Sequence, residues 1–517
     1  MVPPVTPATP SARSAALEAL RRAEKGRIFL RDALHAVFGE TRLEPRDRAL
    51  ATQLAAGVVR HRRTLRLFVS HARGKGRRAT AIQPDLLAVL ELGAFQLLFL
   101  DRVPDYAAVN EAAQAARRTA RSKKSGDKAA GFANGVLRGV QRLITGHDPD
   151  GLPAADAVPH PDGGVVRLGE AVLPDPREDR AAFLGAAYSY PDWLVARWLD
   201  AFGDEAEAVC RGNNRRPRLF ARANPLLHDP AELLRTLEAE APGADGLHAH
   251  PKQGGHATRE RKPGLHAHAV PLREHATAPG PRPLCLDVSD LDPARLDALL
   301  RDGSLTIQDP SAMLAVEALQ PTPGETVLDL CASPGTKTTQ ILEAMRGEGQ
   351  IVACDRSPEK LEPLRQLVAA RGARGLALCL ADDLEASAPA KGFDAALVDA
   401  PCSNTGVLAR RVEARWRLRP DDLEELPRRQ RDLVALAGGF VRPGGRLVYS
   451  TCSLEAEENE GVVRAFLEAH RPWRLAASEQ LFPAADHDGA FWALLKNGEK
   501  RCQVKNGVRN RFSRNGS

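Results

Sequence analysis

The segment TVLDLCASPGTKTTQILEAM, residues 326–345, passes from a short apolar run through a tight turn into a helical pattern. Pro334 and Gly335 are expected to form the turn, and the helix is expected to begin near Thr336. Four more short apolar runs follow, QIVACD, LALCLADD, FDAALVDA and GRLVYSTC, and helical stretches separate several of them. This alternation predicts an α/β Rossmann-like domain with a parallel sheet, which binds ligands beyond the carboxyl ends of its strands.

Acidic residues stand at the ends of the first four predicted strands. They are Asp329, Asp355, Asp382 with its neighbour Asp383, and Asp399. The fingerprint GxGxxG is absent, so a pyrophosphate site is not indicated, but Asp355 could accept hydrogen bonds from both hydroxyls of a ribose. An edge this acidic suits a nucleoside that carries positive charge, and S-adenosylmethionine fits that description. Each acid could instead cap the helix that follows it, for which Asp is a common choice.

Two cysteines follow the fourth and fifth predicted strands, in the turns P-C-S and T-C-S. Neighbouring strand ends lie within roughly 5–10 Å of each other, so Cys402, Cys452 and Asp399 are expected to face one cleft. Cysteines on the earlier strands have apolar neighbours and are expected to pack as small core residues; these are Cys331, Cys354 and Cys379. The eight cysteines include no CxxC pair, so neither a disulfide framework nor a zinc site is indicated.

A thiol beside a methyl donor suggests a specific chemistry. Carbon 5 of a pyrimidine is too weak a nucleophile to attack a methyl group, but addition of a thiolate to carbon 6 makes it reactive. Asp399 is placed to assist the addition as a general acid at the ring nitrogen. A base must afterwards remove the proton from carbon 5, and the second cysteine is a candidate for that step.

Five motifs resemble the RNA 5-methylcytosine methyltransferases of the Nop2/Sun/Fmu family. They are QDPSAMLAVEAL, VLDLCASPGTKT, DAPCSNTGVL, RWRL and VYSTCSLEAEENE. The resemblance implies that Cys452 is the nucleophile and that Cys402 aids product release. It also implies contacts to S-adenosylmethionine from Cys331, Ala332, Ser333, Pro334, Gly335, Thr336, Lys337, Asp355, Asp382 and Asp399.

The chain departs from the family pattern at a few positions. The usual motif CAAPGGK is CASPGTK here, with Ser333 and Thr336 in place of Ala and Gly. Thr336 adds bulk where the backbone approaches the ligand, so the cofactor affinity is expected to differ. Asn404 replaces a frequent Gly, and Ala490 stands where the family prefers an aromatic residue.

The N-terminal part has apolar residues at helical spacing and resembles the all-α NusB-type RNA-binding domain. SYPDWLVARW and NNRRPRLFARAN resemble the small α+β domain that precedes the catalytic domain in this family. This three-part order matches family members that methylate a cytosine of small-subunit ribosomal RNA. The expected organisation is a disordered tail (1–10), a NusB-like domain (11–145), a linker (146–185), a small RNA-guiding domain (186–300) with a flexible His-rich insertion (243–282), the methyltransferase domain (301–495) and a second disordered tail (496–517).

Basic residues are expected to hold the RNA, and the net charge of +6 suits a polyanionic partner. The candidates are Arg117, Arg118, Arg121, Lys123, Lys124, Lys128, Arg138 and Arg415. Most of them are expected in a basic loop between two helices. The alternative for that run is an ordinary solvated surface.

Several broader expectations follow from composition. No run of 18 apolar residues occurs and the first residues lack a secretory pattern, so we expect a cytoplasmic, monomeric protein without a membrane partner. Its expected partner is small-subunit ribosomal RNA before full assembly of the subunit. Six of the 14 histidines fall in the insertion, where a metal site is conceivable but a flexible surface segment without metal is preferred. Two alternatives are the same chemistry on transfer RNA and a non-catalytic RNA-binding factor, although Cys402, Cys452 and Asp399 speak against the latter.

Overall fold

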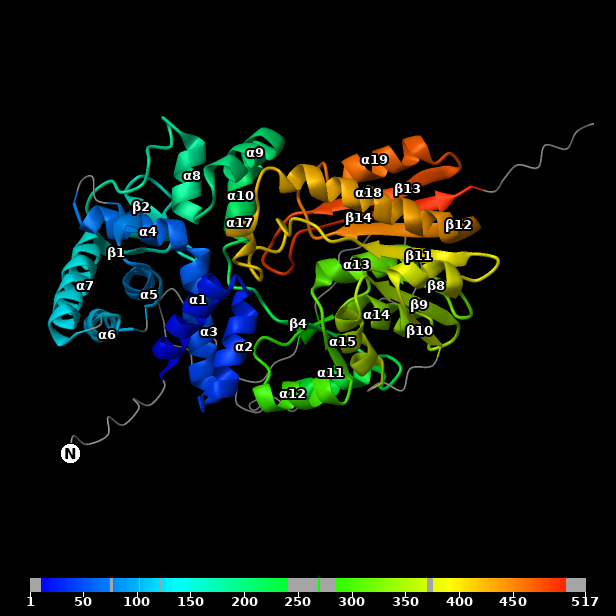
Figure 1. Ribbon diagram of the computed structural model, residues 1–517, viewed down its shortest axis with the longest axis horizontal. Coiled ribbons are helices and arrows are strands. Elements are labelled where there is room, and N and C mark those ends of the chain that lie inside the picture. The colour runs from blue at the N-terminus through cyan, green and yellow to red at the C-terminus, as the bar shows by residue number, and fades with distance from the viewer. Residues whose placement is uncertain are drawn as a thin grey trace, which may run out of the picture.

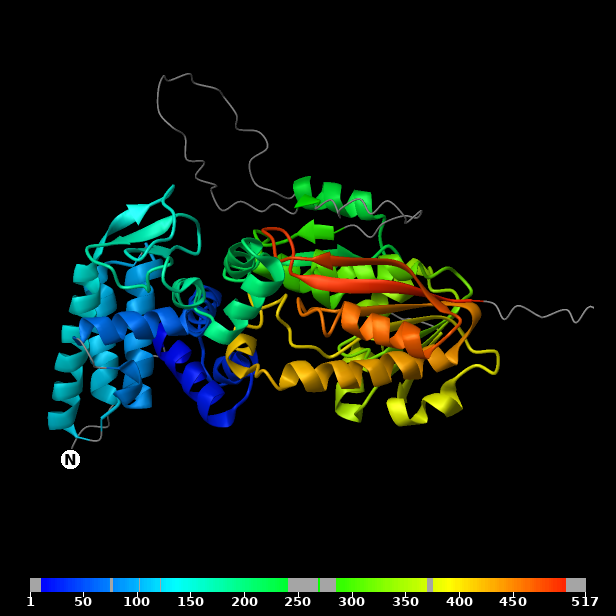
Figure 2. The same ribbon diagram turned by 90° about the horizontal axis from the view of Figure 1, so that it is seen from above.

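The computed structural model describes residues 11–74, 78–101, 103–120, 122–239, 268–269, 285–369 and 375–498. The two predicted tails, except for residues 496–498, most of the His-rich insertion and Arg121 therefore lie outside the described residues. Figures 1 and 2 show an elongated molecule with a helical unit at one end and a large sheet with its helices at the other.

The N-terminal unit is helical, as the apolar spacing predicted. Its elements are α1 (Ala12–Gly26), α2 (Leu30–Glu40), α3 (Pro45–Arg60), α4 (Arg62–Ala72), η1 (Ala79–Ala81), α5 (Pro84–Phe99), α6 (Asp105–Arg118) and α7 (Lys123–Leu143). Helix α5 is apolar on nearly all sides because α1, α3, α4, α6 and α7 pack around it. Ser11 and Ser122 cap α1 and α7 with reciprocal side-chain bonds that satisfy free backbone N–H groups.

The segment that was expected to be a linker is instead folded. It contains β1 (Ile144–Asp148), β2 (Ala157–Pro159) and β3 (Val165–Leu168), which form an antiparallel sheet in the order β1-β3-β2. Three helices follow, α8 (Arg180–Tyr188), α9 (Asp192–Phe202) and α10 (Glu205–Gly212). Side chains from all these parts, including Val166 and Trp198, join the apolar core of the N-terminal unit. That unit therefore extends to about residue 212.

A small α+β domain follows. It comprises β4 (Phe220–Ala223), α11 (Pro230–Ala239), β5 (His268–Ala269), β6 (Cys285–Asp287), α12 (Pro293–Arg301) and β7 (Leu305–Ile307). The strands pair antiparallel in the order β5-β6-β4-β7, and Leu233, Leu237 and Leu299 of the two helices pack on the sheet. Strand β7 lies beyond the predicted boundary at residue 300, so the small domain ends slightly later than expected.

The C-terminal domain is built on a seven-stranded sheet in the order β10-β9-β8-β11-β12-β14-β13. Its strands are β8 (Thr326–Leu330), β9 (Gln350–Asp355), β10 (Leu376–Leu380), β11 (Phe393–Asp399), β12 (Val441–Thr451), β13 (Trp473–Leu481) and β14 (Ala490–Asn497). The first five are parallel, which confirms the predicted α/β class, and β14 is antiparallel to its neighbours.

Helices cover both faces of this sheet (Figure 1). On one face lie α13 (Pro310–Leu319), α14 (Thr336–Ala344) and α15 (Pro358–Ala369), and on the other lie α16 (Leu384–Ser387), α18 (Asp422–Phe440) and α19 (Glu460–Ala469). Two short helices, η2 (Ala381–Asp383) and α17 (Ala414–Arg417), lie in the connections. In the described residues, no helix is long and apolar enough to cross a membrane.

Cys354 and Cys379 are core residues as predicted, since both are buried in the apolar core of the sheet, but the expectation that they would not form a disulfide was wrong. Cys354 and Cys379 are register partners on β9 and β10, and a disulfide joins them. Their Cα atoms are 4.9 Å apart, because in-register neighbours point to the same face of the sheet at bridging distance. Cys331 is only partly buried: it packs against the same core, adopts a left-handed backbone conformation (φ 67°) and also lines a cavity.

Candidate active site

A cavity of about 770 Å³ opens beyond the carboxyl ends of the parallel strands, where a sheet of this kind binds its ligands. The predicted site residues that line it are Cys331, Ser333, Pro334, Thr336, Lys337, Asp355, Asp399, Cys402 and Cys452. Ala332 is buried beside it, and Gly335 holds the left-handed conformation (φ 108°) that lets α14 begin directly after the turn. Asp382 differs: the turn η2 leaves it exposed and outside the lining of the cavity.

One wall of the cavity carries an ion pair. The Nζ atom of Lys337, on the first turn of α14, lies 2.7 Å from Oδ2 of Asp399 at the end of β11. The hydroxyl of Ser450 donates to the other carboxylate oxygen of Asp399 at 2.9 Å. Burial is the largest single influence and lowers the pKa of Lys337, but the charge and hydrogen bond of Asp399, with smaller contributions from Cys452 and Asp329, together raise this pKa. The lysine is therefore a cation at neutral pH.

The other wall carries Asp355, which is nearly buried at the end of β9. The backbone N–H of Ser333 donates to Oδ2 at 3.2 Å, and Lys360 lies 3.2 Å from Oδ1. Asp329 lies deeper, and burial raises its pKa to about 7. Thr338 donates to Oδ2 of Asp329 at 2.5 Å, while Oδ1 has no hydrogen-bond partner in the described part of the chain.

The two loop cysteines meet in this cavity. The Sγ atoms of Cys402 and Cys452 are 3.2 Å apart, because β11 and β12 are adjacent parallel strands whose ends are in register. The hydrogen bond to Cys452 and burial together raise the pKa of Cys402 well above its usual range. Cys402 is thus held as a neutral thiol in direct contact with Cys452. The Sγ atom of Cys452 also lies 3.4 Å from Oδ1 of Asn404.

Sequence reasoning missed a charged triad at the edge of the cavity. Arg410 lies 2.6 Å from Asp488 and 2.8 Å from Asp309, and all three line the cavity. Burial first, and then the neighbouring Asp309, raise the pKa of Asp488 to about 7, although Arg410 opposes the shift. Asp309 belongs to the motif QDPSAML, so a signal for it existed, but its partners lie 101 and 179 residues away.

The prediction that Arg415 binds RNA was wrong. Its side chain is fully buried where the N-terminal unit meets the C-terminal domain. The guanidinium donates to Asn214 Oδ1 at 2.7 Å and to the carbonyl of Leu408 at 3.1 Å, and it stacks on the ring of Tyr190 at 4.3 Å. Its two terminal nitrogens donate inside the protein, and Nε, which has no described partner, is buried with them, so none of its donors is available to a phosphate.

The remaining predicted RNA contacts that the structure describes are exposed; they are Arg117, Arg118, Lys123, Lys124, Lys128 and Arg138. They gather at the end of α6 and along α7, at the end of the molecule away from the large sheet (Figure 1). The expected basic loop is short, because most of these residues belong to the two helices. Arg117 is paired with Asp127 at 3.0 Å.

Three parts of the chain match models of known protein families. Residues 316–493 match the family model of the 16S rRNA methyltransferases RsmB/F, residues 10–142 match the NusB family, and residues 190–253 match the ferredoxin-like domain of RsmF/B-like methyltransferases. The probable ribosomal RNA small subunit methyltransferase B of Bacillus subtilis is 31% identical over 467 residues, which cover 89% of each chain.

Two further proteins are similar over most of the chain. The ribosomal RNA small subunit methyltransferase B of Vibrio cholerae is 30% identical over 495 residues and covers 93% of this chain and 96% of its own. The crystal structure of PH0851 has a TM-score of 0.68 at 23% identity and covers 95% of this chain and 98% of its own. At this sequence identity, the similarity of this chain to PH0851 is a similarity of fold alone.

Proposed function

The chain belongs to the RsmB/F family of 16S rRNA methyltransferases, and on this premise we propose that it methylates carbon 5 of a cytosine in small-subunit ribosomal RNA. The observation that carries the proposal is the contact of two thiols, 3.2 Å apart, in a cavity at the carboxyl ends of the strands. The names of the relatives support ribosomal RNA as the substrate, and the thiol pair supports the chemistry at carbon 5.

The cavity fits S-adenosylmethionine as the methyl donor. A volume of about 770 Å³ accommodates a nucleoside of this size, and Asp355 offers carboxylate oxygen to ribose hydroxyls. The turn from Cys331 to Lys337 would hold the rest of the molecule with backbone groups. When bound, S-adenosylmethionine would supply an electrophilic methyl group.

The first chemical step is the addition of Cys452 to carbon 6 of the cytosine. The thiolate sulfur forms a bond to carbon 6, the ring electrons move towards the ring nitrogen, and carbon 5 becomes nucleophilic. Asp399 is the group that acts on the ring nitrogen. Lys337, 2.7 Å from Asp399, keeps this side chain oriented.

The last step is release of the product. A base removes the proton from carbon 5, the ring double bond forms again, and the bond between carbon 6 and Cys452 breaks. We assign the base to Cys402, which touches Cys452. The Cys402 thiol must first lose its own proton to solvent in the cavity; because its pKa is raised, the resulting thiolate then takes up the proton from carbon 5 readily.

Substitution of each cysteine tests these roles. Cys452→Ala should abolish methyl transfer while S-adenosylmethionine binding stays within about twofold. Cys402→Ala should trap a covalent protein–RNA adduct, seen as a slow band on a denaturing gel, and the double variant Cys402→Ala/Cys452→Ala is the matched control that should show none. Methyl transfer by Cys452→Ala would overturn the proposal. Bisulfite sequencing of ribosomal RNA from cells without the protein tests the substrate, and unchanged cytosine modification would exclude it.

We assign RNA anchoring to the basic cluster on α6 and α7. Lys123 and Lys124 lie on the first turn of α7, where the helix dipole already favours an anion. Basic side chains at such a site are unfavourable for the helix alone but suit a phosphate. The cluster would therefore bind the folded RNA while the target cytosine leaves its stack and enters the cavity.

A further inference from the structure

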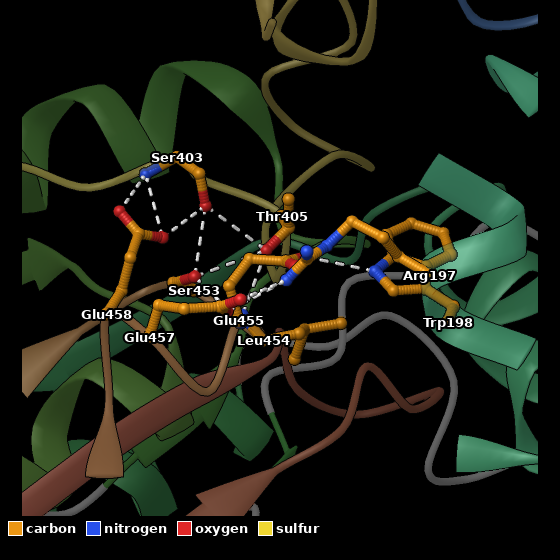
Figure 3. Close-up of polar contacts among 9 residues, drawn as sticks. All are labelled: Arg197, Trp198, Ser403, Thr405, Ser453, Leu454, Glu455, Glu457 and Glu458. Atoms are coloured by element: carbon orange, nitrogen blue, oxygen red, sulfur yellow. Dashed lines mark hydrogen bonds and ion pairs between the residues drawn. The ribbon is translucent and has the colours of Figure 1, made fainter. Parts of the chain in front are cut away.

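A polar network ties together the loops that carry the two cysteines (Figure 3). Ser403 and Ser453, the residues directly after the cysteines, have hydroxyl oxygens 3.0 Å apart. The backbone N–H of Leu454 donates to Thr405 Oγ1 at 2.9 Å, and the N–H of Gly406 donates to the carbonyl of Cys452 at 2.9 Å. Each loop therefore restrains the other within four residues of a sulfur atom.

A buried carboxylate completes this network. The backbone N–H and the hydroxyl of Ser403 donate to Glu458 at 2.9 and 2.5 Å, and Gln430 of α18 donates to it at 3.0 Å. Glu458 lies on the segment after Cys452, while Ser403 follows Cys402. The glutamate thus joins the two cysteine loops from behind the cavity.

The loop after Cys452 is also anchored outside its own domain. Glu455 is almost fully buried, and Trp198 of α9 donates its ring N–H to Oε1 at 3.1 Å. Arg197 of the same helix lies 3.0 Å from Oε2. Figure 3 shows α9 approaching this loop with both side chains directed at Glu455. Trp198 itself is immobilised because its side chain is fully buried against Tyr190 in the N-terminal core.

The loop after Cys402 has a corresponding anchor. The buried side chain of Asn213, directly after α10, donates to the carbonyl of Thr405 at 2.9 Å and accepts the backbone N–H of Leu408 at 3.0 Å. Leu408 and Leu454, one from each cysteine loop, are members of the apolar core of the N-terminal unit. Both loops are therefore packed into, and hydrogen-bonded to, helices of another folding unit.

We propose that the N-terminal unit sets the distance between the two sulfur atoms, with Trp198, Arg197 and Asn213 as positioning residues that act through Glu455 and the loop backbones. The importance of this sulfur–sulfur distance for catalysis rests on the proposed function. The inference that the N-terminal unit sets the distance does not. On this account the active site is completed by α9 and the residue after α10, which pack in the N-terminal unit but fall within the match to the ferredoxin-like domain and beyond the match to NusB. A frame of this kind matters because a displacement of about 1 Å at reacting groups can cost roughly 100-fold in rate.

The test uses full-length variants. Glu455→Ala removes the acceptor of Trp198 and Arg197, and Glu455→Gln keeps one acceptor oxygen. Trp198→Phe removes the donor N–H and part of the ring volume while leaving a smaller ring in the core. Glu457→Gln is the matched control, because Glu457 also pairs with Arg197, at 2.8 Å, but its side chain is 47% exposed and makes no described bond to the cysteine loops.

Two measurements are made on each folded variant. The first is kcat and KM for RNA methylation. The second is the rate at which glutathione disulfide couples Cys402 to Cys452: one S–S bond forms with loss of two protons and two electrons, and glutathione disulfide is reduced to two glutathione molecules. Mass spectrometry of the linked peptides identifies this pair among the other cysteines.

We expect Glu455→Ala to lower both kcat and the coupling rate at least tenfold with KM nearly unchanged. Glu455→Gln should recover part of each rate. Glu457→Gln should match the parent protein within twofold. If Glu455→Ala does not fold, Trp198→Phe is measured in its place, and we expect its kcat and its coupling rate to fall about threefold or more. Coupling rates within twofold of the parent in the folded variants would overturn the proposal. Methylation by Cys452→Ala would instead overturn the proposed function and leave the coupling test valid.

Discussion

Arg415→Met is the substitution whose effect can be derived most directly from the structure. The arginine is fully buried between the N-terminal unit and the C-terminal domain, and in the described residues no carboxylate pairs with it. Its guanidinium is held by backbone carbonyls, by the Asn214 side chain and by the face of Tyr190. Burial lowers its pKa, so the cation is costly to bury and depends on these partners.

The magnitude follows from the individual contacts. Loss of the 3.1 Å bond leaves the carbonyl of Leu408 without a described donor, which costs about 1–3 kcal/mol. Asn214 Oδ1 loses its 2.7 Å bond to the charged guanidinium, at about 1.5–3 kcal/mol, but keeps the hydroxyl of Tyr190 as a donor at 3.2 Å. Loss of the stacking on Tyr190 adds about 1–2 kcal/mol. Methionine fills most of the volume and removes a buried charge, which recovers part of this. We expect a net destabilisation of about 3 kcal/mol.

Calorimetry and an RNA-binding assay on Arg415→Met together show whether Arg415 stabilises the fold or contacts RNA. A loss of about 3 kcal/mol should lower the melting temperature of a unit of about 200 residues by roughly 6–12 °C. Arg417→Met is the control, because Arg417 is exposed and should change the melting temperature by only a degree or two. An unchanged melting temperature together with weaker RNA binding would refute this reasoning and restore Arg415 as an RNA contact.

Three other outcomes are expected. Gly406→Ala should lower the methylation rate at least tenfold. A Cβ atom there would lie 2.5 Å from the carbonyl oxygen of Gly489 and 2.9 Å from that of Cys452, so the cysteine loop would have to move. Near-normal activity would count against the tight packing of this loop. Burial raises the pKa of Asp329 from 3.8 to about 7. Between these two pH values the folded protein holds a proton on Asp329 that the unfolded chain has lost. The free energy of unfolding should therefore fall, by up to about 4 kcal/mol, as the pH rises from about 3.8 to about 7. Asp329→Asn should abolish this fall in melting temperature, and a parent protein without it would contradict the assignment. Alanine at Lys123, Lys124 and Lys128 should weaken RNA binding, reduce the slope of log affinity against log salt by about 2 and leave kcat unchanged; an unaltered slope would exclude this cluster.

The large sheet and the meeting of the two cysteines could be predicted from the sequence, because both depend on local patterns. Apolar runs that end in acidic or cysteine-containing turns mark the strands. Residues that follow adjacent parallel strands then come together at one edge, as Cys402 and Cys452 do.

The errors share a different cause, which is contact between distant parts of the chain. A basic residue beside a tryptophan looks alike in sequence whether it faces RNA or the interior, and the partners of Arg415 include Arg60, 355 residues away. The strands of residues 144–168 are too short to show a clear alternation, so the segment read as a linker. Glu455 and Asn213 fall within motifs that carry the family resemblance, but no local pattern predicts their contacts, which arise only where two folding units meet.

Mass spectrometry of the trapped adduct tests the central claim most directly. Cys402→Ala is incubated with S-adenosylmethionine and the RNA substrate, the complex is digested, and the modified peptide is sequenced. We predict that the nucleotide is attached to Cys452 and that it carries the added methyl group. Attachment to any other residue, or a stable adduct that forms equally well in Cys452→Ala, would contradict the assignment of the nucleophile.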